Sequence, residues 1–279
     1  MAFDVENKII VFDTTLRDGE LMPGVQMNVE QKVELARFLE TMRVDVIEVG
    51  YPGAFEKDFE AVFQVAQLVK ESIICVLASD KPEEIVTAAE AIQPAARGRI
   101  HLYTPVNLRH IAAGSEAETL SRIRESITKA RSYCADVEWS AFDATRSEPG
   151  FLCQAVETAI SSGATTISIP DSMGGASPSS FAELIEMLRQ KVENIDLIVL
   201  SVHCHDDLGL AVENSIAALE RGARQIECSI NGLGARKGNA DLAEVVRRVA
   251  QMPNYYTDVD LGQLEKASEL VKQMVVQGY

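Results

Sequence analysis

The sequence IIVFD at residues 9–13 is followed by a helical pattern at residues 29–42 and then by DVIEVG at residues 45–50. This strand–helix–strand period continues along the whole chain. Short apolar runs of this kind are typical of parallel strands that are buried on both faces. Further strands are expected at residues 73–79, 99–104, 136–141, 165–171, 197–205 and 225–231.

Amphipathic helical patterns separate these strands, as a period near 3.6 residues indicates. They lie at residues 29–42, 55–70, 81–92, 115–133, 149–162, 178–192, 209–221 and 238–251, with a last helix at 261–276. Eight strand–helix units predict an α/β fold of the (β/α)8 TIM barrel type. A doubly wound open sheet is the alternative, although no GxGxxG sequence follows the first strand. We expect one catalytic barrel domain over residues 1–279 that ends in a short C-terminal helix.

The composition excludes several classes of protein. The 26 basic and 42 acidic residues give a net charge of −16 without a basic cluster, which argues against a nucleic-acid partner. No apolar run approaches the roughly 20 residues of a membrane span, and MAFDVENK at the N-terminus does not resemble a signal peptide. The five cysteines form no CxxC motif, which favours reduced thiols. A cytoplasmic protein without a membrane partner is therefore expected.

Metal-ligand-type residues stand at the ends of two strands that are far apart in the sequence. The first strand runs into RDGE, which contains Asp18, and the run LIVLSVHCHDDLG at residues 197–209 contains His203 and His205. Residues two apart on a strand point to the same side, so both imidazoles can reach one ion together with Asp18. Asn239 follows the eighth strand at the same end of the barrel. These donors predict a site for one divalent cation, Mg²⁺, Mn²⁺ or Zn²⁺.

Two further residues are candidate catalytic groups. Arg17 precedes Asp18 at a strand-to-loop turn, where a guanidinium can stabilise a developing enolate or oxyanion. Glu48 lies with Asp45 in an apolar strand, and a carboxylate in such a run needs a partner. Arg17 or a metal-bound water can be that partner; a purely structural pair is the alternative.

The loop GLGARKGNA and the cysteines Cys204 and Cys228 carry weaker signals. Arg236 and Lys237 in this loop are placed to cover an anionic ligand such as the phosphates of an acyl-CoA. Cys204 is expected to point away from its two histidine neighbours and to pack, and Cys228 is expected to lie in the core.

Six motifs occur in one order: DTTLRDGE, IEVGYP, VEWSAFDATRSEP, IPDSMG, HCHDDLGLAVENSIAALERGA and INGLGARKGNADLAEVV. Together they resemble 2-isopropylmalate synthase and its relatives, the homocitrate and citramalate synthases and 3-hydroxy-3-methylglutaryl-CoA (HMG-CoA) lyase, which form the DRE-TIM metallolyase superfamily. The resemblance covers roughly residues 8–272. It is more specific for the superfamily than for the reaction.

The resemblance implies a (β/α)8 barrel with one divalent metal, whose ligands match Asp18, His203, His205 and Asn239. The synthases act in amino-acid biosynthesis and condense acetyl-CoA with a 2-oxo acid, which chelates the metal. In this family the arginine of RDG stabilises the enolate or carbonyl oxygen, which assigns Arg17 to catalysis and substrate binding. The other candidate substrate-binding residues are Ser172, Tyr103, Asn107 and His110.

The sequence departs from the synthase pattern at several positions. Phe142 stands where the synthases have a catalytic glutamate, and an apolar ring cannot transfer a proton. The other departures are Leu21 for a glutamine, Val106 and Asn107 for Thr-Ser, and Asp206 for an asparagine. Val106 and Phe142 are expected to make part of the site less polar.

Three functional hypotheses follow. The first is a condensation of an acyl-CoA with a 2-oxo acid that gives a 2-alkylmalate-like product. The second is a carbon–carbon lyase or aldolase of the HMG-CoA lyase type, although GLGARKGNA lacks the cysteine that the lyases carry in this loop. The third is a degenerate barrel without catalysis. The C-terminal helical and regulatory domains of the synthases are absent from residues 1–279, so a separate subunit that supplies the lid is one option. The resemblance to the synthases implies a homodimer.

Overall fold

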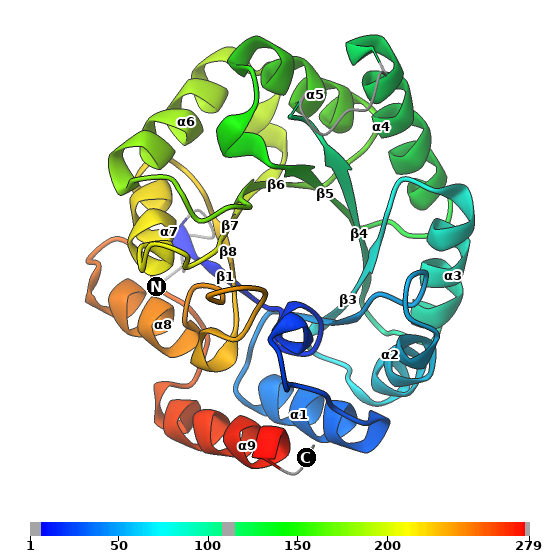
Figure 1. The fold of residues 1–279 in the computed structure, drawn as a ribbon, viewed down its shortest axis with the longest axis vertical. Coiled ribbons are helices and arrows are strands. Elements are labelled where there is room, and N and C mark those ends of the chain that lie inside the picture. The colour runs from blue at the N-terminus through cyan, green and yellow to red at the C-terminus, as the bar shows by residue number, and fades with distance from the viewer. Residues whose placement is uncertain (1–6, 108–114, 277–279) are drawn as a thin grey trace, which may run out of the picture.

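The computed structural model describes residues 7–107 and 115–276. Its parallel strands close into a barrel in which each strand pairs with the next in sequence and β8 pairs with β1 (Figure 1). This confirms the predicted (β/α)8 barrel and excludes the open sheet. The strands are β1 (Ile10–Asp13), β2 (Val46–Gly50), β3 (Ile73–Ala78), β4 (Gly98–Pro105), β5 (Val137–Phe142), β6 (Thr166–Asp171), β7 (Val199–Cys204) and β8 (Gln225–Cys228).

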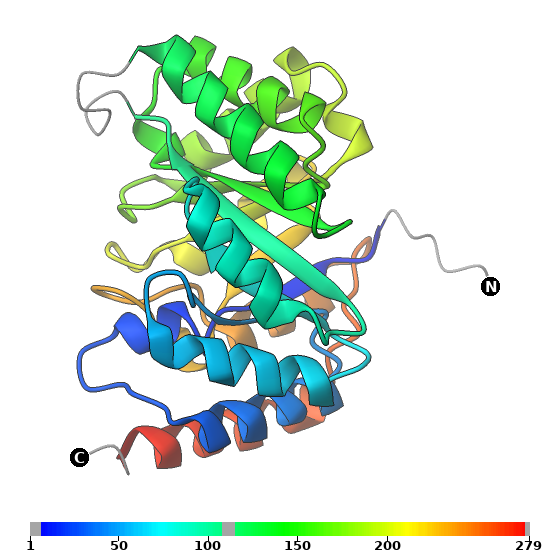
Figure 2. The ribbon, with the colours of Figure 1, turned by 90° about the vertical axis from the view of Figure 1, so that its right-hand side faces the viewer.

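Helices surround the barrel, and the last helix lies beside the first in both views (Figures 1 and 2). They are α1 (Val29–Thr41), α2 (Glu56–Leu68), α3 (Pro82–Ile92), α4 (Glu116–Arg131), α5 (Pro149–Ser161), α6 (Pro178–Lys191), α7 (Ala211–Glu220), α8 (Leu242–Gln251) and α9 (Leu264–Val276). The largest shift from the expected bounds is the start of α8. The side chain of Asp241 accepts a hydrogen bond from the backbone N–H of Glu244 and caps the helix there, which ends the preceding loop.

Two kinds of interior meet at the strands. Apolar side chains such as Ile47, Ile74 and Ile100 are fully buried in the main apolar core. Inside the barrel, polar groups dominate: Arg99 Nη1 donates to Glu138 Oε2 and to Gln225 Oε1, each at 2.9 Å. Because these polar groups are paired, the cost of burying them is offset.

The loops that follow the strands gather at one end of the barrel, on the left of Figure 2. Asp18 begins the short 3-10 helix η2 (Asp18–Leu21) after β1, and His205 directly follows β7. A bridge between His205 and Asn239 draws the loop after β8 to the same place. Residues that follow the first strand and the last two strands therefore form one site.

Two smaller expectations can be compared with the structure. All five cysteines are free, and Cys204 and Cys228 are fully buried, so both pack as predicted. Among the residues that the structure describes, no helix combines the length and the apolarity that crossing a bilayer requires.

Candidate active site

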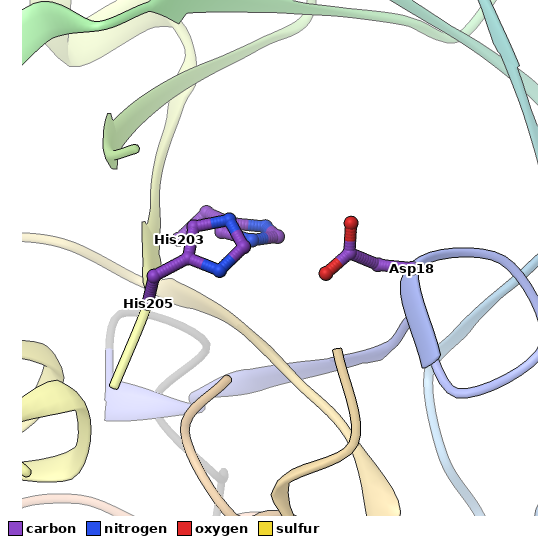
Figure 3. Close-up of side chains that lie close together, drawn as sticks. All are labelled: Asp18, His203 and His205. Atoms are coloured by element: carbon purple, nitrogen blue, oxygen red, sulfur yellow. The ribbon is translucent and has the colours of Figure 1, made fainter. Parts of the chain in front are cut away.

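The predicted metal ligands of β1 and β7 converge at the open end of the barrel. Candidate ligand atoms of Asp18, His203 and His205 all lie within 4.8 Å of one another. Figure 3 shows the two imidazoles side by side, facing the carboxylate across a gap, and their ring centroids are 5.0 Å apart. Three buried or largely buried donors that face one point are the arrangement a cation needs.

Asn239 completes this group from the loop after β8. Its Nδ2 donates to Asp18 Oδ2 at 2.6 Å, and its Oδ1 lies 3.1 Å from His203 Nε2. The loop can come this close because position 234 is glycine: a Cβ on Gly234 would lie 2.9 Å from Asp18 Oδ2. The amide of Asn239 is therefore packed against two of the candidate ligands, Asp18 and His203.

Groups behind the histidines fix their orientation. His203 Nδ1 lies 2.7 Å from Glu227 Oε2, and His205 Nδ1 lies 3.3 Å from the carbonyl oxygen of Gly238. Both partners can only accept when Glu227 is ionised, so Nδ1 carries the hydrogen and Nε2 is left as the ligand atom. Such a partner behind each imidazole is typical of metal sites.

Electrostatics favour the ligand forms of Asp18 and His205. Burial lowers the pKa of His205 to about 4, with a further contribution from His203, so this ring is neutral at physiological pH. Burial opposes the ionisation of Asp18, but Arg17 and the two histidines hold its pKa below the ordinary value. Burial also disfavours the charged form of His203, yet Glu227 raises its pKa. An ionised carboxylate, two imidazoles and an amide oxygen fit a divalent cation.

Arg17 is held between two carboxylates. Its Nε donates to Glu48 Oε2 and its Nη1 to Asp18 Oδ1, each at 2.6 Å. Glu48 is fully buried and also accepts from Thr14 Oγ1 at 2.7 Å. Burial opposes its ionisation, but the Arg17 charge holds the pKa of Glu48 well below the usual range. Of the partners considered for Glu48, the structure shows Arg17, whereas Asp45 pairs with Lys8 at 2.6 Å.

His101 on β4 is a site residue that the sequence analysis missed. Its Nδ1 lies 2.8 Å from Glu48 Oε1, and its side chain belongs to the lining of the cavity described next. Burial favours the neutral ring, but Glu48 outweighs it and raises the pKa of His101 to about 9. Glu48 is therefore shared by two cations, Arg17 and His101. The sequence feature that could have identified His101 is a histidine at an inward position of a strand.

A cavity of about 750 Å³ opens above these groups. We call Asp18, His203, His205 and Asn239, from β1, β7 and β8, the metal wall. Opposite them stand rings carried by β4, β5 and the loop after β2, which we call the aromatic wall. The aromatic wall consists of Tyr51, Phe55, Tyr103 and Phe142.

The aromatic wall is a continuous row of rings. The ring centroids of Tyr51 lie 6.2 Å from those of both Phe55 and Tyr103, and Tyr103 lies 6.3 Å from Phe142. Its polar atoms are two phenolic hydroxyls: Tyr51 Oη donates to Glu84 Oε2 at 2.5 Å and lies 3.3 Å from Tyr103 Oη. Phe142 makes this side of the cavity less polar, as expected.

Only some of the predicted substrate-binding residues line the cavity. Arg17, Tyr103 and Ser172 line the cavity. Asn107 lies outside that lining, and its Nδ2 donates to Asp143 Oδ2 at 2.7 Å. His110 lies outside the described residues.

Two of the sequence departures have structural explanations. Val106 is fully buried in the apolar core outside the cavity lining, so its expected effect on the polarity of the site is not found. Asp206 Oδ1 accepts from the backbone N–H of Ala211 at 2.9 Å and so holds the start of α7. Neither residue faces the substrate cavity directly.

Arg236 in the glycine loop lies at the cavity, but its charge is already paired. Its guanidinium donates to both carboxylate oxygens of Asp207, the shortest distance being 2.9 Å, and to the carbonyl oxygen of Ser172 at 2.7 Å. The loop is thereby tied to the segments that follow β6 and β7.

The whole barrel is similar to known proteins. The sequence profile of the HMGL-like family matches residues 8–271. A 2-isopropylmalate synthase of Afipia carboxidovorans is 48% identical over 273 residues, which cover 95% of this chain and 52% of that protein. One of Nitrobacter hamburgensis is 47% identical with the same coverage. The chain thus spans about half the length of the curated relatives that it matches.

Solved structures agree on the fold. An HMG-CoA lyase of Brucella melitensis superposes with a TM-score of 0.81 at 20% identity, covering 97% of this chain and 99% of that one. The enzyme of Pseudomonas aeruginosa gives 0.80 at 21% identity, with 98% and 94% covered. At this identity the likeness concerns the fold alone.

Proposed function

The chain belongs to the HMGL-like family, and on that premise we propose that it condenses an acyl-CoA, acetyl-CoA first of all, with a 2-oxo acid. The product is a 2-alkylmalate-like acid. The observation that carries the proposal is the convergence of Asp18, His203 and His205 beside Arg17 at the floor of one cavity. The names of the relatives that are nearly half identical support the same reaction.

The metal wall prepares the 2-oxo acid for attack. A divalent cation bound by Asp18, His203, His205 and Asn239 would supply a Lewis acid for the carbonyl of the oxo acid. Glu227 and the carbonyl oxygen of Gly238 hold the two imidazoles in their ligand orientation.

Arg17 stabilises the negative charge that develops on oxygen as the carbon–carbon bond forms. Glu48 and Asp18 engage two of the five guanidinium N–H groups, so three remain for the substrate oxygen among the contacts of the described residues. Glu48 itself is fully buried and bonded to Arg17, so we assign it a positioning role rather than contact with substrate.

Ser172 is the proposed contact for the carboxylate of the oxo acid. Its Oγ accepts from the backbone N–H of Asp143 at 2.9 Å, which leaves the hydroxyl hydrogen to donate into the cavity. Asn107 supports this corner from behind, because it bonds the side chain of the same Asp143. Tyr103 is left to contact the rest of the substrate.

Turnover tests the proposal. Protein loaded with Mg²⁺, Mn²⁺ or Zn²⁺ is incubated with acetyl-CoA and a panel of 2-oxo acids, and thiol release is recorded together with calorimetric binding of each oxo acid. Metal-dependent binding with thiol release that requires the oxo acid is expected. Cleavage of 3-hydroxyacyl-CoA substrates without condensation would identify a lyase instead, and no binding would identify a non-catalytic barrel.

We also propose that the barrel acts as a homodimer or with a separate subunit that covers the cavity mouth. The support for the homodimer is the resemblance of the sequence motifs to those of the synthases. Light scattering after size-exclusion chromatography is expected to give twice the mass of 30.5 kDa. A monomer that turns over at full rate would contradict both forms of the proposal.

A further inference from the structure

The aromatic wall contains one chain of hydrogen bonds whose direction can be derived. It begins at Glu84, which is buried at the start of α3 and accepts from Tyr51 Oη at 2.5 Å. Lys81 Nζ and the backbone N–H of Ser79 also donate to this carboxylate, at 2.9 and 3.1 Å. These three donors leave Glu84 ionised, and an ionised carboxylate only accepts.

The position of Glu84 is built into the fold. A Cβ on Gly53 would lie 2.8 Å from both Cβ and Cγ of Glu84, so the loop after β2 leaves space for this side chain only as glycine. Burial raises the pKa of Glu84, but the hydrogen bonds of Tyr51, Lys81 and Ser79 outweigh it and bring the pKa to about 2. The carboxylate is therefore a fixed acceptor behind the aromatic wall.

The acceptor at Glu84 fixes the hydrogens of both tyrosines. Tyr51 has one hydroxyl hydrogen and gives it to Glu84, so the contact of 3.3 Å between Tyr51 Oη and Tyr103 Oη requires Tyr103 to be the donor. The hydrogen of Tyr103 is then committed as well. Among the contacts of the described residues, Tyr103 Oη has no second partner and presents only lone pairs to the cavity.

The metal wall and the aromatic wall together orient a bound oxo acid. If its carboxylate and carbonyl lie at the metal wall, its side chain extends towards β3, β4 and β5. There it meets Leu77, Phe142 and the ring of Tyr103, which form an apolar surface. The polar groups that line the cavity on this side are Tyr103 Oη, which accepts and does not donate, and the side chains of Ser140 and His101.

We propose that the cavity selects a 2-oxo acid whose apolar side chain ends in a hydrogen-bond donor, and that Tyr103 Oη accepts this hydrogen. The inference rests on the proposed function, because it assumes that an oxo acid binds at the metal wall. It makes Tyr103 a specificity-determining residue, and it makes Tyr51 and Glu84 the positioning residues that set the direction of its hydroxyl.

Three aromatic oxo acids that differ only at one end test this direction. Manganese-loaded protein is titrated calorimetrically, without acyl-CoA, with 4-hydroxyphenylpyruvate, phenylpyruvate and 4-methoxyphenylpyruvate, and with pyruvate as the small reference. The phenol can donate, phenylpyruvate can do neither, and the methyl ether can only accept. We expect the phenol to bind about tenfold more tightly than the methyl ether, which is the usual effect of one hydrogen bond.

Two variants test whether the preference for the phenol comes from Tyr103 Oη or from the aromatic wall as a whole. Tyr103→Phe is expected to abolish the difference between the phenol and the ether. Tyr51→Phe releases the hydrogen of Tyr103, which can then donate, so the methyl ether is expected to gain affinity until it matches the phenol. Glu84 keeps Lys81 and the Ser79 N–H in this variant, so the loop stays satisfied. Tyr133→Phe removes an exposed hydroxyl and serves as the matched control.

The outcomes distinguish this inference from the function on which it rests. Metal-dependent binding of pyruvate with equal affinities for the three aromatic acids, or with the ether tightest, would overturn the inference and leave the condensation in place. Binding of the phenol that Tyr103→Phe does not weaken would also overturn it. Failure of pyruvate and of all three acids to bind would contradict the proposed function, and the inference with it.

Discussion

The metal wall and the aromatic wall face one cavity but are built on different principles. On the metal wall, each donor is fixed by a partner behind it, as Glu227 fixes His203 and Arg17 fixes Asp18. On the aromatic wall, rings meet at centroid distances near 6 Å, and a single hydrogen-bond chain runs through Tyr51 and Tyr103. Buried charges tolerate no missing partner, whereas apolar contacts can be exchanged at modest cost. We therefore propose that the metal wall fixes the chemistry and that the aromatic wall sets the choice of substrate.

The strongest test of this difference is the removal of the charge that links Glu48 to Asp18. Arg17→Met leaves Glu48 fully buried with His101 as its remaining cation. We expect the free energy of unfolding to fall by about 3 kcal/mol, the lower part of the range for breaking a buried ion pair. Urea unfolding measures the effect, with Arg248→Met as the control because that arginine forms an exposed pair with Glu213. Equal losses in the two variants would show that the site charges are not interdependent.

A smaller effect is expected from the group behind His203. Glu227→Gln keeps an acceptor for His203 Nδ1 but removes the charge that makes the imidazole a stronger donor to a cation. Loss of such a partner typically weakens metal binding by about 10- to 100-fold. Calorimetric titration with Mn²⁺ measures it, and Glu213→Gln on the surface provides the control. Unchanged affinity would mean that the metal wall does not depend on its supporting groups.

The pH dependence of metal binding tests the protonation state of His203 on the metal wall. The pKa of His203 is raised, so the metal-free ring carries a proton that a metal at Nε2 must displace. The apparent affinity for Mn²⁺ is therefore expected to rise with pH, by up to about tenfold per unit, until the pH exceeds the pKa of His203. His205, with a pKa lowered to about 4, contributes no such dependence at neutral pH. Calorimetry in buffers of different ionisation enthalpy counts the released protons, and a count of zero at pH 6 would contradict this account.

The smallest effect is expected on the aromatic wall. Phe142→Glu places a carboxylate beside Tyr103 without a cation to pair it, and we expect the affinity for oxo acids with apolar side chains to fall about tenfold. Pyruvate binding changes less, and Phe142→Leu, which stays apolar, serves as the control. A rise in thiol release in Phe142→Glu would instead mean that the ring is a tolerated replacement in a conventional synthase site.

The sequence predicted the barrel and the metal wall because both depend on local patterns. The period of apolar runs identifies strands, and the ends of parallel strands in a barrel define where Asp18, His203 and His205 meet. The residues that support them, Glu227 and His101, were not predicted, because they face the barrel axis from strands far away in the sequence. Which inward residues meet is decided by the closed register and not by any local motif.

The aromatic wall shows the same limit from another side. Tyr51 and Glu84 are 33 positions apart, and their contact depends on the space left by Gly53. A tyrosine after a strand and a glutamate in the first turn of a helix each have ordinary explanations, the second being a favourable charge at a helix N-terminus. Only the assembled loops show that the two side chains form one hydrogen-bond chain with Tyr103.

The hydrogen bond between Asn239 and Asp18 joins residues that are 221 positions apart. A cation bound by both residues would cross-link the first and the last strand–helix units, because neither unit alone supplies all of its ligands. Its binding energy would then count towards the closure of the whole barrel, and would be lost if β8 opened from β1. Chelation should accordingly speed hydrogen exchange in β1 and β8 before it does so in β4 and β5.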